Sequence, residues 1–162
     1  MHWLPVTKWR SFRHWVGAEL FEIREGELDP REVEAAVAWP GAGAILTFSG
    51  VTRDNDQGEK VLGLSYEAYP QMAEAEMAKI GADVARQWPG SRCAMVHRIG
   101  AVPIGEASVI IAVATAHRVE AYLASRFAID ALKARVPVWK KEHLAGGDRW
   151  KSNAESPTEG RK

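Results

Sequence analysis

The apolar run from Ser108 to Thr115, which has the sequence SVIIAVAT, constrains the fold more than any other part of this chain. A run of eight residues rich in β-branched side chains is typical of a strand. Strands that are apolar on both faces occur in the interior of a covered sheet. We therefore expect residues 108–115 to form a central strand.

Helix signals divide the rest of the chain. Asp29 before Pro30 predicts a helix that ends near Trp39. Further helices are predicted from Pro70 to about Trp88 and from about Val119 to Arg135, before the helix-breaking Pro137. Apolar or alternating segments predict strands at residues 20–23, 42–51, 61–69, 92–99 and 138–140. A polar loop is expected at 53–60, with turns at 100–105 and 146–148.

The order of these elements, β-α-β-β-α-β-β-α-β, predicts one α/β or α+β domain. A length of 162 residues suits a single domain. We place this domain at residues 18–151, after an N-terminal extension (1–17) and before a disordered tail (152–162). A single cysteine, no apolar stretch long enough to span a membrane and no signal peptide favour the cytoplasm.

Charge is unevenly distributed, although 21 basic and 21 acidic residues balance overall. Residues 117–151 hold eight bases against four acids, a net charge of +4, whereas residues 19–34 hold seven acids against two bases, a net charge of −5. A local basic excess in a neutral protein favours an anionic ligand over a long nucleic acid. A solvated surface helix is the alternative interpretation.

General catalytic motifs are absent from the sequence. It has no Walker loop, GxGxxG, CxxC or HExxH, and Ser49-Gly50 lacks the GxSxG frame of a nucleophile elbow. His97 and His117 are candidate metal ligands, but neither has a carboxylate or cysteine at ligand spacing. We therefore predict neither a metal site nor a cofactor.

Three polar segments are candidates for ligand binding. His117-Arg118 lies where an apolar strand gives way to a helix, so the pair could bind a phosphate or simply cap the helix. Arg53 follows a strand, and it could bind a ligand or solvate the adjoining loop. Lys133 could form a surface pair with Asp130. Alternatively, its many basic neighbours could lower its pKa and make it a nucleophile or proton carrier.

Several blocks of this sequence occur together, in order and spacing, in one known family. They are GAILTFSGVTR (43–53), LSYEAYPQM (64–72), HRIG (97–100), AHR (116–118), LKARVPVWKKE (132–142) and GDRW (147–150). Each is weak alone, but together they resemble the MoaE family, the catalytic (large) subunits of molybdopterin synthase. The resemblance covers about residues 19–151, and residues 1–17 have no counterpart in it.

This resemblance implies a single-domain, hammerhead-like α/β fold with a mixed, largely antiparallel sheet and about three helices. It also implies a sulfurtransferase of molybdenum cofactor biosynthesis that converts cyclic pyranopterin monophosphate into the molybdopterin dithiolene. The sulfur donor would be a small ubiquitin-like subunit that ends in a Gly-Gly thiocarboxylate. Two large subunits would form the central dimer of a heterotetramer, without nucleic acid, membrane or metal.

Carried over by position, the resemblance makes Lys133 and Lys140 catalytic. It assigns the anionic pterin pocket to Arg53, His117, Arg118 and Arg149, some of which could reach across the dimer. The substrate's phosphodiester and the partner's thiocarboxylate are both anions, which agrees with this set of cations. The alternative function is a non-catalytic binding protein for the ubiquitin-like sulfur carrier.

Overall fold

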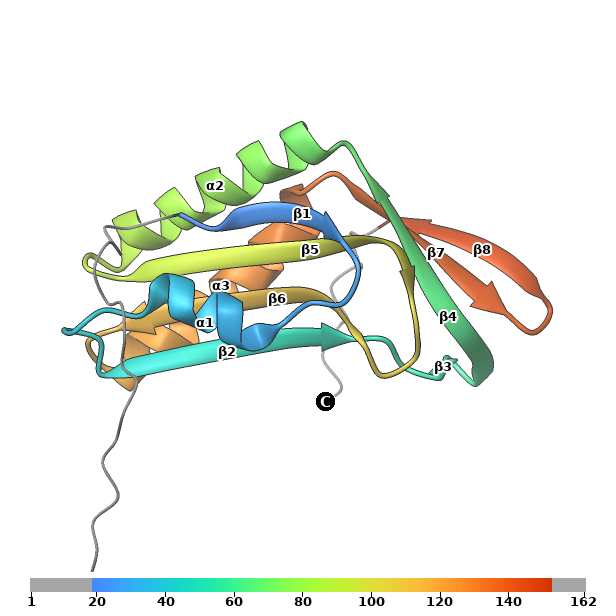
Figure 1. The fold of residues 1–162 in the computed structure, drawn as a ribbon, viewed down its shortest axis with the longest axis horizontal. Helices are drawn as coiled ribbons and strands as arrows, with labels where there is room; N and C mark the ends of the chain where they lie inside the picture. The colour runs from blue at the N-terminus through green and yellow to red at the C-terminus, as the bar shows by residue number, and fades with distance from the viewer. Residues whose placement is uncertain (1–18, 153–162) are drawn as a thin grey trace, which may run out of the picture.

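The computed structural model describes residues 19–152, so the predicted extension at 1–17 and tail residues 153–162 lie outside the described residues. Within this range a single open sheet is covered by helices on both faces (Figure 1). The path through the sheet is β2-β6-β5-β4-β7-β8, with β1 beside β5 and the two-residue β3 beside β4. All pairings are antiparallel except that of β1 with β5.

The central part of the sheet consists of β1 (Phe21–Glu25), β2 (Ala44–Val51), β5 (Arg92–Val102) and β6 (Ala107–Thr115). From Ser108 to Thr115 every residue of β6 is buried. The expectation of a central strand is therefore confirmed.

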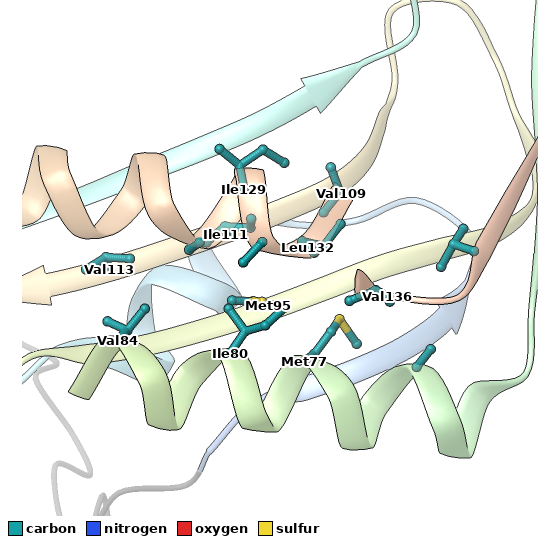
Figure 2. Packing of buried hydrophobic residues seen from close by; sticks show 14 of the residues in the cluster. Met77, Ile80, Val84, Met95, Val109, Ile111, Val113, Ile129, Leu132 and Val136 are labelled. Carbon is teal, nitrogen blue, oxygen red and sulfur yellow. The ribbon is translucent and has the colours of Figure 1, made fainter. Parts of the chain in front are cut away.

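Helices α2 (Pro70–Gln87) and α3 (Arg118–Arg135) cover one face of this central part, and the short helix α1 (Pro30–Val37) covers the other. Figure 2 shows how the larger core forms on the α2/α3 face. Its side chains come from α2 (Met77, Ile80, Val84), the sheet (Met95, Val109, Ile111, Val113) and α3 with its C-cap (Ile129, Leu132, Val136). The alternate residues of β5 and β6, among them Val96 and Ile110, point to the smaller core under α1.

Local sequence accounts for where the helices begin and end. Asp29 caps α1, because its Oδ1 accepts a hydrogen bond from the backbone N–H of Arg31 at 2.9 Å. Pro70 is the first residue of α2, where its missing N–H costs nothing. Helix α3 stops at Arg135, two residues before Pro137. The three predicted helices are confirmed to within a few residues.

The outer part of this sheet extends beyond its central part. It contains β4 (Glu59–Ala68) and the hairpin of β7 (Val138–Leu144) and β8 (Gly147–Ser152), with β3 (Asn55–Asp56) at its edge (Figure 1). Strand β5 joins the two parts of the sheet, since it pairs with β6 as far as His97 and with β4 from Gly100 onward. Gly100 has φ +80°, a left-handed conformation that side chains disfavour, and it lies where the partner changes.

The predicted fold class is confirmed: an α+β chain with a mixed, largely antiparallel sheet and three helices among residues 19–152. Three local predictions were wrong. The expected turn at 100–105 begins too early, because β5 continues to Val102. The polar loop at 53–60 contains β3 and the start of β4. The turn predicted at 146–148 is placed too late, because β8 begins at Gly147, a strand held by backbone pairing to β7 rather than by any apolar pattern of its own.

Candidate active site

The two predicted catalytic lysines lie near one buried aromatic pair. Tyr66 of β4 and His97 of β5 are 6% and 2% exposed, and their rings pack edge to face with centroids 5.0 Å apart. Lys140 of β7 lies directly opposite Tyr66 in the sheet. Lys133, in the last turn of α3, is close enough for its charge to act on His97. Helix and sheet thus bring both lysines to the Tyr66–His97 pair.

His97 is held neutral in this position. Its pKa is lowered to about 4, mainly by burial and to a lesser extent by the positive charge of Lys133, against an opposing contribution from its bond to the Arg98 carbonyl. Its Nδ1 lies 2.9 Å from that carbonyl oxygen. The sequence offered His97 as a candidate metal ligand, but no metal-type group of three or more His, Cys, Asp or Glu occurs among residues 19–152.

Lys140 belongs to a network of ion pairs centred on Glu142. The Glu142 side chain is 3% exposed and contacts Lys140 at 3.5 Å, Lys151 at 3.1 Å and Arg149 at 2.9 Å. Burial by itself would raise the pKa of Glu142. Hydrogen bonds from Arg149 and Lys151 outweigh that effect, and the net pKa is lowered. This carboxylate is therefore an anion that holds three cations together.

Asp56 of β3 extends this network toward the loop. It binds Arg149 at 3.3 Å, Arg53 at 3.6 Å and, through a short contact, Lys151. The hydrogen bond from Lys151 lowers the pKa of Asp56. Glu59 joins the network through an ion pair of 3.2 Å with Arg149. The three carboxylates of Asp56, Glu59 and Glu142 are outnumbered by four cations, so the cluster keeps a net positive charge. The cations are Arg53, Lys140, Arg149 and Lys151.

Strand register explains why these side chains share one face. In the β7–β8 hairpin Lys140 pairs with Lys151 and Glu142 pairs with Arg149. On the other side of β7, Lys140 pairs with Tyr66. Since side chains alternate between faces along a strand, these partners project from the same side of the sheet. A shift by one residue would turn all of them to the opposite face.

The structure separates the other two predicted residues from this cluster. His117 is the N-cap of α3, its side chain makes no capping hydrogen bond, and Arg118 begins the helix. Lys133 lies fifteen residues further along, which corresponds to about 22 Å of helix. His117 instead lines a pocket of about 530 Å³ with Trp39, Trp88 and Glu120. One chain therefore joins Lys140, Arg53 and Arg149 in one network, with Lys133 near the adjoining Tyr66–His97 pair, but it does not bring His117 or Arg118 there.

Sequence reasoning missed five contributors to the cluster: Tyr66, Asp56, Glu59, Glu142 and Lys151. Each lies in or beside a block that was singled out, or in the loop predicted at 53–60, yet only the register of β3, β4, β7 and β8 reveals that they meet. Cys93, the single cysteine, lies outside the cluster. Burial raises the pKa of its thiol to about 12, in keeping with the apolar strand that holds it.

Fold and site together define an α+β protein with a lysine-centred, cationic site suited to anionic ligands. No helix of the described region is long and apolar enough to cross a membrane.

Comparison with known proteins agrees with this description. A family model described as MoaE protein matches residues 23–135. A molybdopterin synthase catalytic subunit from Halalkalibacterium halodurans is 46% identical over 130 residues, which are 80% of this chain and 83% of the relative. The crystal structure of molybdopterin synthase from Staphylococcus aureus superposes with a TM-score of 0.79 at 38% identity, covering 81% of this chain and 96% of that one.

A complex of subunits 1 and 2 of the molybdopterin-converting factor from Helicobacter pylori shares the fold. Its TM-score is 0.65 at 24% identity, covering 80% of this chain and 88% of that one. The chain belongs to the MoaE family. Membership gives it the function of a molybdopterin synthase catalytic subunit, an enzyme subunit of molybdenum cofactor biosynthesis.

Proposed function

We propose that this chain transfers sulfur to cyclic pyranopterin monophosphate from the C-terminal thiocarboxylate of a small ubiquitin-like subunit. The observation that carries the proposal is the approach of Lys133 and Lys140 to the Tyr66–His97 pair, beside a cluster of net positive charge. The phosphodiester and the thiocarboxylate are both anions, and charge develops on oxygen when the cyclic phosphate opens. Fixed cations stabilise all three.

Within this site we assign Lys133 to the incoming thiocarboxylate and Lys140 to proton transfer or charge stabilisation at the pterin carbons. Arg53 and Arg149 bind the phosphate of the precursor. The side chain of Arg53 is 72% exposed and has one long ion pair, so it can turn toward a ligand. Arg149 is anchored on Glu142, so it offers donors in a fixed place.

Reconstitution tests the reaction. Purified protein is mixed with cyclic pyranopterin monophosphate and a thiocarboxylated ubiquitin-like subunit, and the dithiolene product is measured. We expect product from the native chain and none from Lys133→Ala. Lys79→Ala is the matched control, because Lys79 is 68% exposed on α2 and outside the cluster, and this variant should keep the native rate. A native rate in Lys133→Ala would reject the assignment.

The competing function is a binding protein that holds the sulfur carrier without chemistry. It predicts a stable complex with the small subunit but no dithiolene from the native chain. The charge cluster argues against it, because a scaffold does not need a buried carboxylate that gathers three cations beside a lysine.

His117 and Arg118 join the site, in our proposal, from a second copy of the chain. They lie too far along α3 to reach their own Lys133. The first turns of α3 also expose Val119, Tyr122 and Leu123, which are 60%, 64% and 54% exposed. An apolar surface of this kind is suited to a symmetric contact between two copies, in which each helix start is placed against the other chain.

Mixing two inactive variants tests the shared site. Lys133→Ala and Arg118→Ala are combined and allowed to exchange subunits. A shared site predicts recovery of about a quarter of native activity, because half of the dimers are mixed and each mixed dimer has one intact site. A site built within one chain predicts no recovery at any mixing ratio.

A further inference from the structure

Two lysines lie directly opposite each other in the β7–β8 hairpin, and one of them, Lys151, has no role assigned so far. Lys140 pairs with Lys151, and facing residues of neighbouring strands point their side chains to the same side of the sheet. Like charges in this arrangement repel each other and destabilise a hairpin. The arrangement therefore requires anions close to the two ammonium groups.

Lys151 bridges two carboxylates that come from different strands. Its Nζ lies 3.1 Å from Oε1 of Glu142 in β7, and it makes a short contact with Oδ2 of Asp56 in β3. The hydrogen bond with Asp56 raises the pKa of Lys151, so this lysine stays charged and is unsuited to carrying protons near neutral pH. Lys151 is therefore a fixed cation of the cluster.

The two lysines share one oxygen of Glu142. Oε1 is 3.1 Å from Lys151 but 3.5 Å from Lys140, whereas Arg149 binds Oε2 at 2.9 Å. Lys151 thus holds the shared oxygen more closely and leaves Lys140 with a long, weak contact. Without Lys151, that oxygen would attract Lys140 alone. The ammonium group of Lys140 would then be drawn toward the buried carboxylate and away from a ligand.

Lys151 also supplies the excess positive charge of the cluster. The cluster holds four cations and three carboxylates, and without Lys151 the two numbers would be equal at three each. An anionic precursor would then approach a cluster with no net charge, and the attraction that the native cluster exerts would be lost.

We propose that Lys151 is a positioning residue of the active site: by pairing with Glu142 and Asp56 it keeps Lys140 available for the reaction and keeps the cluster positive toward the anionic precursor. The proposal rests on the proposed function, since it presupposes that Lys140 meets the precursor. Lys151 itself touches no reacting atom. It acts through the two carboxylates, because a carboxylate that is already paired attracts the other cations less strongly.

Replacing Lys151 with glutamine tests this role, because the variant keeps a hydrogen-bond donor but loses the charge. Lys141→Gln is the matched control. Lys141 adjoins Lys140 in β7 and so points to the opposite face of the same hairpin, where it pairs with Asp148 at 2.8 Å. Its side chain is 30% exposed, against 32% for Lys151, so the two variants remove the same charge from equally exposed positions.

Two kinetic constants should change in Lys151→Gln. We expect KM for the precursor to rise about 10-fold, the effect of one nearby unit charge on an anion at a protein surface. We also expect kcat to fall about 10-fold, because Lys140 is drawn out of place. Lys141→Gln should keep both constants near native, and Lys151→Arg, which keeps the charge, should restore both.

Binding of inorganic phosphate, measured by calorimetry on the folded proteins, gives a readout without turnover. Lys151→Gln should bind phosphate more weakly than the native chain. Asp56→Asn removes one negative charge and should bind it more tightly. Opposite signs indicate charge balance, since damage to the structure would weaken binding in both variants. The measurement on Asp56→Asn also decides the question if Lys151→Gln does not fold.

Native kcat and KM in Lys151→Gln, or an equal loss in Lys141→Gln, would overturn the proposal. Weaker phosphate binding in Asp56→Asn would overturn it as well. Failure of the proposed function has a different signature: the native chain then yields no dithiolene, while the phosphate measurements still decide the role of Lys151.

Discussion

Replacing the buried, neutral His97 should change how the stability of the protein depends on pH. The unfolded chain binds a proton at this residue near pH 6.5, whereas the folded chain, in which burial lowers the pKa, does not until about pH 4. Stability from this group is therefore complete above pH 6.5 and is lost as the pH falls toward 4. This difference between the folded and unfolded pKa, at 1.36 kcal/mol per pKa unit, corresponds to about 3 kcal/mol of stability in total.

Urea unfolding of the native protein and of His97→Gln measures this effect. Glutamine is polar but does not titrate, so the stability of the variant should not depend on protonation at this position. Between pH 7 and pH 5 the native protein should lose about 2 kcal/mol relative to the variant. Protein concentration must be the same at each pH, since association contributes to apparent stability.

The carboxylates whose pKa is lowered, Glu142 and Asp56 among them, lose their contribution mainly below about pH 4.5, and they do so equally in both proteins. The window from pH 7 to pH 5 therefore isolates His97. Parallel stability curves for the two proteins across that window would refute the claim that this histidine is buried and neutral.

Three further substitutions test the site and its surroundings. Glu142→Ala leaves its cations without a counter-charge, and because two of them are about one-third exposed we expect a loss of about 2 kcal/mol in urea unfolding rather than the larger cost of a fully buried pair. Gly43→Ala would place a Cβ 2.2 Å from the carbonyl oxygen of Ala116, so thermal unfolding should show a loss of about 1–3 kcal/mol and the displaced start of α3 should raise KM for the precursor. Arg126→Ala breaks an exposed pair with Asp130 and should change stability by less than about 0.5 kcal/mol with kcat unaltered, so a large effect would mean that this face of α3 contacts another subunit.

Local sequence determined the elements of this fold. Contacts within a few residues set the two helix starts, at Asp29-Pro30 and Pro70, and the helix stop before Pro137. The largely apolar run of β6 is likewise visible in consecutive residues. Such signals can be found along a single chain, because capping, proline geometry and side-chain periodicity act locally.

The charged residues that gather around the site were also visible in the sequence, as a basic excess between residues 117 and 151. The sequence did not show which of these residues lie next to one another. Tyr66 lies opposite Lys140 although 74 positions separate them, and β8 has no apolar pattern of its own to announce it.

Only the tertiary structure decided that Lys133 and Lys140 both lie near the Tyr66–His97 pair, while His117 and Arg118 lie at the far end of α3. Strand register and the length of one helix set these positions. Both are fixed by pairing and packing between segments distant in the sequence, where the free energy of burying the shared core chooses one alignment from several that local preferences allow.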